Sequence, residues 1–271
     1  MVIMKRFVPF LKAEPLVAVV RLSGVISSAG VGGRAGLNDQ ALAPVLEKAF
    51  RKGKPKAVAL SINSPGGSPV QSSLIAARIR RLSQELDVPV HAFVEDVAAS
   101  GGYWLACAAD RILADDSSVT GSIGVISASF GFHDLLQRHG IERRVHTAGG
   151  SKSFMDPFLP EKPEDVQRLK QLQEPIHQNF MAEVKARRGD RLNQSTPMFS
   201  GEIFVGRQAL EAGLIDGIGH LVPTMKQAFG PKVRFRQYGI RRSVLSLFGS
   251  QLATSAAQGL EDRALWARYG L

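Results

Sequence analysis

Two stretches of this sequence share one order: an apolar strand, a turn and a helix. Lys56 to Asn63 is predicted to be a buried strand, followed by the turn Ser64-Pro-Gly-Gly-Ser-Pro69 and a helix from about Gln71 to Leu86. Pro89 to Phe93 is predicted to be a second strand, followed by a helix of small residues over Ala98 to Ala109. Short strands that alternate with helices predict an α/β fold with a parallel sheet covered by helices. The functional site should then lie at the strand ends.

The rest of the chain continues this alternation until about Gln237, where amphipathic segments with basic faces are predicted to form helices. We divide the chain into an N-terminal segment (1–16), one α/β domain (17–225) and a basic, helical C-terminal extension (226–271). The other predicted elements are a strand from Val17, a helix around Leu42–Phe50, strands at Arg111–Ala114, Ser122–Ser129 and Arg143–Thr147, and helices at Asp134–Arg138, Glu161–Arg188 and Val205–Gly213.

The composition is that of a globular protein with a basic surface. Hydrophobic residues make up 44% and charged residues 21% of the 271 residues, which excludes a disordered or fibrous chain. The formal charge of +10 fits nucleic acid, an anionic membrane surface or a basic cytoplasmic protein, but no basic stripe with interleaved aromatics supports nucleic-acid binding. The basic run Arg187-Arg188-Gly-Asp-Arg191 is interpreted as solvated surface. Cys107, the single cysteine, is interpreted as a core residue.

The N-terminus does not have the pattern of a signal peptide. Only five apolar residues, Phe7 to Leu11, follow Lys5 and Arg6, and no cleavage site of small residues comes after them. No window elsewhere approaches the roughly 18 apolar residues that span a bilayer. We therefore expect a cytoplasmic chain without a membrane anchor, for which peripheral membrane contact stays open.

Ser100 is the candidate nucleophile. A serine hydroxyl needs a base within hydrogen-bond reach and donors for the oxyanion that forms when it attacks a carbonyl. The sequence Ala99-Ser-Gly-Gly102 places Ser100 where a loop enters a helix, so the amide of Gly101 can face a developing negative charge. Gly67, in the earlier glycine turn, is expected at the same edge of the sheet and is the candidate for the second donor.

Several ordered motifs make the chain similar to the signal peptide peptidase A family of serine-lysine peptidases, in its half-length form without a membrane anchor. The resemblance runs from about Val17 to about Val222. It rests on Ser64-Pro-Gly-Gly67, Ala98-Ala-Ser-Gly-Gly-Tyr-Trp104, Thr120-Gly-Ser-Ile-Gly-Val125, Ser151-Lys-Ser153, Asp156-Pro-Phe158 and Gly206-Arg-Gln-Ala-Leu-Glu-Ala-Gly213 with Leu-Ile-Asp216.

The resemblance implies a fold and a set of roles. The fold is a ClpP/crotonase-like spiral of ββα units. Ser100 is the nucleophile and Lys152 the general base, Gly67 and Gly101 supply the oxyanion amides, and Ser122 hydrogen-bonds the lysine. The implied substrates are signal peptides or other short, apolar or unfolded peptides. The implied assembly is a homo-oligomeric ring or dome.

General chemistry agrees with a lysine base, which must be neutral and therefore shielded from water or placed near positive charge. ClpP-type peptidases, which share the fold, use a histidine about two dozen residues after the serine, and no histidine stands there in this chain. His146, near the lysine segment, is interpreted as a strand residue. No metal-ligand spacing, Walker loop or dinucleotide fingerprint is present, so no cofactor is expected.

Two other interpretations remain open. A crotonase-like acyl-CoA enzyme also builds an oxyanion hole from two glycine-turn amides, but it usually transfers protons with carboxylates, which would leave Ser100 idle. A catalytically silent assembly protein of the same fold is the non-enzymatic alternative.

Overall fold

The computed structural model describes residues 14–28, 36–149, 152–240 and 263–271. The chain divides into two compact units, each described by itself below. The larger comprises Met1–Ile123 and Glu183–Leu271, and the smaller comprises Gly124–Ala182.

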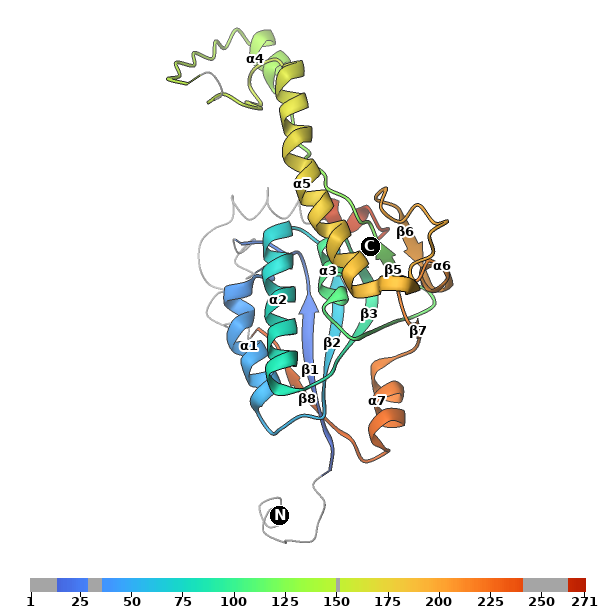
Figure 1. Cartoon of the computed structure of the whole chain (residues 1–271). Coiled ribbons are helices and arrows are strands. Elements are labelled where there is room, and N and C mark those ends of the chain that lie inside the picture. Colours follow the sequence, from blue (N-terminus) through green and yellow to red (C-terminus); the bar gives the residue numbers. More distant parts are fainter. Residues whose placement is uncertain (1–13, 29–35, 150–151, 241–262) are drawn as a thin grey trace. The chain divides into compact units, whose positions relative to one another are not determined.

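The larger unit is built on an eight-stranded sheet (Figure 1). Its main path runs β6-β5-β3-β2-β1-β8, and β4 pairs with both β3 and β7. The path is parallel from β5 to β8, whereas β5 and β6 pair antiparallel. The strands are β1 (Leu16–Ser23), β2 (Ala57–Ser64), β3 (Val90–Ala99), β4 (Arg111–Ala114), β5 (Val119–Gly121), β6 (Ile203–Val205), β7 (Gly217–Ile218) and β8 (Arg234–Tyr238).

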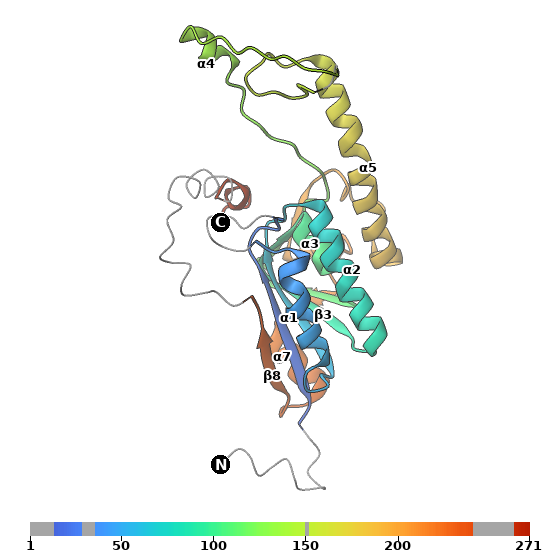
Figure 2. The ribbon, with the colours of Figure 1, turned by 90° about the vertical axis from the view of Figure 1, so that its left-hand side faces the viewer.

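Helices cover the sheet, as the alternating pattern predicted. Figures 1 and 2 show α1 and α2 side by side against the strands. Side chains that alternate along β1 and β2, such as Val17, Val19 and Ala59, pack instead with Met225 of α7. The helices of this unit are α1 (Asp39–Arg51), α2 (Pro69–Leu86), α3 (Gly101–Cys107), α6 (Gly206–Glu211) and α7 (Leu221–Phe229).

Local signals determine where α1 and α2 begin. The side chain of Asn38 accepts a hydrogen bond from the amide of Ala41 at 2.8 Å, which caps α1. Ser68 caps α2 in the same way, and Pro69 occupies the first helical position, where its missing N–H costs nothing. The glycine turn before Ser68 is therefore held directly against the start of a helix.

The carboxyl ends of three parallel strands meet at one edge of the sheet. Ser64 of β2 pairs with Ala98 of β3, and Ala99 of β3 pairs with Gly121 of β5. The residues that follow these strands, including Ser100, therefore lie along one edge. This is the arrangement that the repeated order of strand, turn and helix predicted.

The smaller unit contains α4 (His133–Arg138) and the first part of α5 (Pro163–Arg188), whose last turns belong to the larger unit. Two strands predicted from the sequence are wrong here: the described residues at 122–129 and 143–147 form neither strand. Ile126 is 65% exposed and Val145 38% exposed, so no neighbouring strand or covering helix buries the apolar side chains of these stretches, as β-structure needs.

Other differences are smaller. β3 continues through Ala99, so α3 begins at Gly101 rather than at Ala98, and α6 ends at Glu211. The short strands β6 and β7, the helix α7 and the strand β8 were not predicted. β8 comes from the segment predicted to be a C-terminal extension, yet it pairs parallel with β1; residues 263–267 form a helical turn. Among the described residues, no helix combines the length and apolar character of a membrane span.

Candidate active site

Ser100 lies at a sharp turn between β3 and α3. Its backbone has φ 52° and ψ −123°, a conformation that is uncommon for a residue with a side chain. Three hydrogen bonds hold it there: its amide donates to the carbonyl of Gly121 at 2.8 Å, and its carbonyl accepts from the amides of Tyr103 and Trp104 at 3.0 and 3.1 Å. Backbone strain of this kind clusters at functional sites. The hydroxyl is therefore carried by a rigid elbow rather than by a mobile loop.

The glycine turn at Gly66 and Gly67 lies directly against this elbow. A Cβ atom added to Gly66 would stand 2.8 Å from both the amide nitrogen of Gly101 and the Cβ of Ser100, and one added to Gly101 would stand 3.4 Å from the amide nitrogen of Gly67. Ile26 holds the turn in place, because its amide donates to the carbonyl of Gly66 at 2.8 Å and its carbonyl accepts from the amide of Ser68 at 2.8 Å.

The two amides proposed for the oxyanion hole are consequently neighbours. Gly101 is the first residue of α3, where an amide has no acceptor within its own helix. Among the described residues, neither the amide of Gly67 nor that of Gly101 donates a hydrogen bond. Two adjacent amide donors without acceptors, beside a serine, form the arrangement that stabilises an oxyanion.

Ser122 follows β5 at the same edge. It too has a positive φ, of 52°, and the residue is 8% exposed. Its amide donates to the carbonyl of Glu202 at 2.7 Å, and its hydroxyl accepts from the Tyr269 hydroxyl at 3.4 Å. The carbonyl of Gly121, the residue before Ser122, accepts the hydrogen bond from the amide of Ser100. Because that carbonyl belongs to the peptide unit between Gly121 and Ser122, a single peptide unit links the two serines.

Lys152 belongs to the smaller unit. It lies in a turn in which its amide donates to the carbonyl of Gly149 at 3.3 Å, and its side chain is exposed. Four of the five predicted site residues, Ser100, Gly67, Gly101 and Ser122, thus gather in the larger unit. The lysine stands on the other unit, and its role remains a prediction.

Other reactive groups fit the chemistry less well. Burial raises the pKa of the Cys107 thiol to about 12, so a thiolate nucleophile there is not accessible near neutral pH. Burial, followed by the neighbouring Arg111, lowers the pKa of His91. His146 lies in an exposed stretch outside the strands, so its interpretation as a strand residue is wrong. In the described part of the chain, no three His, Cys, Asp or Glu side chains are arranged to hold a metal ion.

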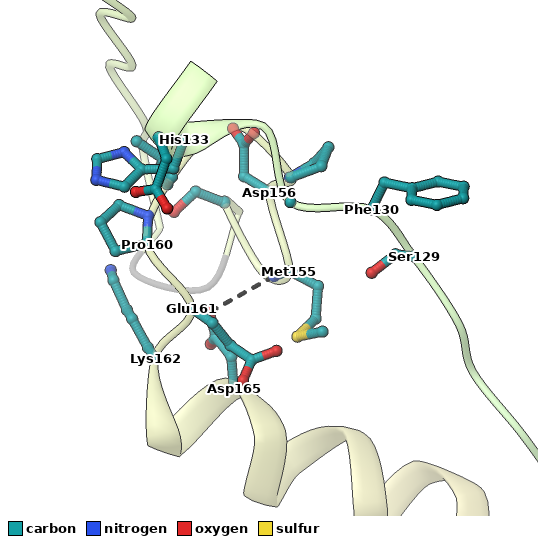
Figure 3. Close-up of a pocket in the computed structure, with 14 residues that line it drawn as sticks. Ser129, Phe130, His133, Met155, Asp156, Pro160, Glu161, Lys162 and Asp165 are labelled. Atoms are coloured by element: carbon teal, nitrogen blue, oxygen red, sulfur yellow. Dashed lines mark hydrogen bonds between the residues drawn. The ribbon is translucent and has the colours of Figure 1, made fainter. Parts of the chain in front are cut away.

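A pocket is found in each unit. The pocket of the smaller unit has a volume of about 340 Å³, and Figure 3 shows the hydrogen bond within it, from the amide of Met155 to the Asp165 carboxylate at 3.5 Å. The pocket of the larger unit, of about 610 Å³, is lined by Glu95, Asp115 and His220 among others. The described residues that line them include neither Ser100 nor Lys152.

A cluster of arginines was missed by the sequence interpretation. Arg188 is 2% exposed: its Nε donates to the carbonyl of Gly213 at 2.9 Å, and it forms an ion pair of 2.9 Å with Asp216. Arg187 is partly buried and donates to carbonyls at the end of α3. The prediction of a solvated surface is therefore wrong for these two residues. One signal pointed to this cluster, because Asp216 closes a motif on which the family resemblance rests.

Comparison with known proteins identifies the family. The model of peptidase family S49 matches residues 83–229, which is more than half of the chain and includes Ser100, Gly101, Ser122 and Lys152. The chain belongs to peptidase family S49. The resemblance to signal peptide peptidase A is confirmed by a putative signal peptide peptidase SppA of Enterococcus faecium, 31% identical over 74% of this chain and 60% of that protein.

A higher identity is found with a longer protein. Over 99% of its length the S49 chain is 46% identical to a protein of Brucella melitensis named Na(+)/H(+) antiporter NhaA, of which the match covers 39%. The chain thus spans about two fifths of the length of the first curated relatives that it matches.

A solved structure supports the fold class of this S49 chain. The 1510-N membrane-bound stomatin-specific protease, solved as a lysine-to-alanine mutant in complex with a substrate peptide, superposes with a TM-score of 0.53 at 15% identity. The superposition covers 92% of this chain and all of that one. The predicted ClpP-like α/β fold with a mostly parallel sheet is confirmed.

Proposed function

We propose that this S49 chain is a serine endopeptidase that cleaves peptide bonds with Ser100 as nucleophile and Lys152 as general base. One observation carries the proposal: a strained serine elbow stands beside two adjacent glycine amides that lack acceptors among the described residues. Such an elbow gives a nucleophile and an oxyanion hole without any side-chain rearrangement. Membership of a peptidase family and the order of the motifs support the lysine.

The reaction follows from these roles. The neutral amine of Lys152 takes the proton of the Ser100 hydroxyl while the oxygen attacks the carbonyl carbon of the substrate. The negative charge on the carbonyl oxygen is then stabilised by the amides of Gly67 and Gly101. As the tetrahedral intermediate collapses, the lysine returns the proton to the leaving amine, and an ester remains on Ser100. Water, deprotonated by the same lysine, hydrolyses that ester and restores the enzyme.

Ser122 completes the proposed site. Its positive φ and its link through Gly121 to the amide of Ser100 keep its position fixed relative to the nucleophile. We assign to its hydroxyl a hydrogen bond with the amine of Lys152 that orients the lone pair toward Ser100. The substrates that we propose are short apolar or unfolded peptides, including signal peptides. The name of the Enterococcus relative supports signal peptides.

Labelling with a fluorophosphonate tests the proposal. The probe should modify the wild-type protein at Ser100, whereas Ser100→Ala should stay unlabelled and Lys152→Met should be labelled at least 100-fold more slowly. Ser68→Ala, which changes a serine of the neighbouring turn, is the control. Wild-type protein that resists the probe but binds an acyl-CoA would instead support the crotonase-like alternative. Folded protein with neither activity would support the silent assembly protein.

We also propose a homo-oligomer, because Lys152 stands on a unit of its own and a neighbouring copy is one source of the base. Specific activity should then fall on dilution, and mixing Ser100→Ala with Lys152→Met should restore activity. A fully active monomer would contradict a shared site. We further propose a cytoplasmic protein whose basic charge allows peripheral contact with anionic membrane surfaces, which co-sedimentation with anionic vesicles would reveal.

A further inference from the structure

The helix that begins at the nucleophile also has an unusual end. α3 is seven residues long and fully buried, and the carbonyls of Cys107, Ala108 and Ala109 at its end have no helical amide to accept from. Two guanidinium groups fill this need. Arg187 donates to the carbonyl of Cys107 at 2.8 Å and to that of Ala109 at 2.9 Å, and Arg80 donates to that of Ala108 at 3.2 Å.

The same end is tied to the start of β3. The amide of Asp110 donates to the carbonyl of Val90 at 2.8 Å, and its carboxylate accepts from the amide of Val90 at 2.8 Å. The carboxylate also pairs with Arg80 at 2.7 Å and with Arg187 at 3.6 Å. β3, the elbow at Ser100 and α3 therefore form a loop that runs out from Val90 and closes at Asp110, with the nucleophile at its apex.

A closed loop transmits a shift at its base to its apex. α3 spans about 10 Å, so it is too short and too tightly buried to bend without moving its first turn. That first turn holds the carbonyl of Ser100 through the amides of Tyr103 and Trp104, and it contributes the amide of Gly101. A misplacement of a reacting group by about 1 Å can cost an enzyme about 100-fold in rate.

We infer that Arg187, together with Arg80, is a positioning residue for the nucleophile: the two guanidinium groups clamp the closed end of the loop and so fix Ser100 and the Gly101 amide. This inference rests on the proposed function of Ser100. It gives a role to two arginines that come from α5 and α2 and that lie at the opposite end of α3 from the reacting atoms.

Placing two positively charged side chains close together in a partly buried clamp costs free energy. Burial, followed by repulsion from Arg80, lowers the pKa of Arg187, although a guanidinium keeps its proton throughout the physiological range. Two cations thus share one carboxylate: the side chains of Arg187 and Arg80 are 25% and 19% exposed, whereas that of Asp110 is 39% exposed. Solubility alone would not require two partly buried arginines at this place. The three buried carbonyls do require them, because each carbonyl needs a hydrogen-bond donor.

The test uses the full chain and measures the rate of fluorophosphonate labelling together with kcat and KM for an apolar fluorogenic peptide. Arg187→Gln and Arg80→Gln should each slow labelling and lower kcat at least tenfold, with KM within about twofold of wild type. Matched controls remove an exposed charge from the same two helices: Lys185→Gln on α5 and Arg81→Gln on α2 should keep both rates within twofold.

Arg187→Lys keeps the positive charge but donates less well to two carbonyls at once, so its labelling rate should lie between those of wild type and Arg187→Gln. It also provides the test if Arg187→Gln does not fold. All rates are measured well below the melting temperature of each variant. A folded variant, whether Arg187→Gln or Arg187→Lys, with a wild-type labelling rate would overturn the inference. Wild-type protein that is not labelled would instead overturn the proposed function.

Discussion

Replacing Gly67 with alanine should remove one oxyanion donor while leaving Ser100 and Lys152 untouched. A methyl group at this position would lie 2.9 Å from the carbonyl carbon of Ile26 and closer still to its oxygen, so the turn must move away from Ile26. Because the carbonyl of Ile26 also accepts from Ser68, at the cap of α2, the strain is relieved most easily by rotating the peptide unit that carries the Gly67 amide. The donor would then no longer point toward the oxyanion.

The size of the effect can be separated into two parts. Gly67 has φ 139°, and a side chain there adds strain of about 1–3 kcal/mol to the folded state, which lowers stability rather than turnover. Loss of one oxyanion donor lowers kcat by about 10²–10³. Gly24→Ala is the matched control, because Gly24 has φ 112° but nothing within 4 Å of an added Cβ. It should lose stability alone.

The assay compares kcat and KM for an apolar fluorogenic peptide with unfolding in urea for both variants. Gly67→Ala should lose at least 100-fold in kcat with little change in KM, and Gly24→Ala should turn over at nearly the wild-type rate. A folded Gly67→Ala protein whose kcat stays within threefold of the Gly24→Ala protein would refute the assignment of Gly67 to the oxyanion hole.

Three further results are expected. Burial alone would raise the pKa of Asp216, but hydrogen bonds from Arg188 and from the amide of Ile112 outweigh it and lower the pKa. The stability that the ionised carboxylate contributes is therefore present above about pH 4 and is lost as the pH falls further. Asp216→Asn should lower the free energy of unfolding at pH 7 by about 3–5 kcal/mol, measured in urea, and should flatten that acid dependence. The Cys107 thiol should react with a maleimide at pH 8 only after unfolding, since a pKa of about 12 leaves about one thiolate in ten thousand; rapid labelling of the native protein would contradict its burial. Ser122→Ala should lower kcat about tenfold or more with unchanged stability, and an unaltered kcat would remove this residue from the site.

The sequence predicted those parts of the molecule that local signals determine. The strands before Ser64 and Ser100 and the helices after them were recognised because apolar runs, glycine turns and helix caps act within a few residues of one another. The gathering of Gly67, Gly101 and Ser122 with Ser100 also follows from topology, because parallel strands that are neighbours end at the same edge.

The errors concern features that depend on distant partners. The stretch 122–129 is apolar enough for a strand, but composition does not reveal whether another strand lies beside it, and Ile126 is left exposed. Arg188 belongs to a basic run that is typical of a surface, yet its acceptors, Gly213 and Asp216, follow at least 25 residues later. β8 was missed for the same reason: Arg234 and Arg236 flank a single apolar residue, Phe235, and only the pairing with β1 makes them part of the sheet.

The two serines of the proposed site, Ser100 and Ser122, both have a positive φ, which residues with a side chain rarely adopt. Ser100 and Ser122 each have φ 52°, a conformation that glycine would adopt at no cost, and each such residue costs roughly 1–3 kcal/mol. Ser100 follows Ala99 of β3, Ser122 follows Gly121 of β5, and Ala99 and Gly121 are paired in the sheet. The amide of Ser100 also donates to the carbonyl of Gly121. A fold that used these positions only as turns would be more stable with glycine at both. Serine at both positions agrees with a proposed function that uses the hydroxyl groups rather than the backbone alone, and the strain is then the free-energy cost of holding both hydroxyls at one sheet edge.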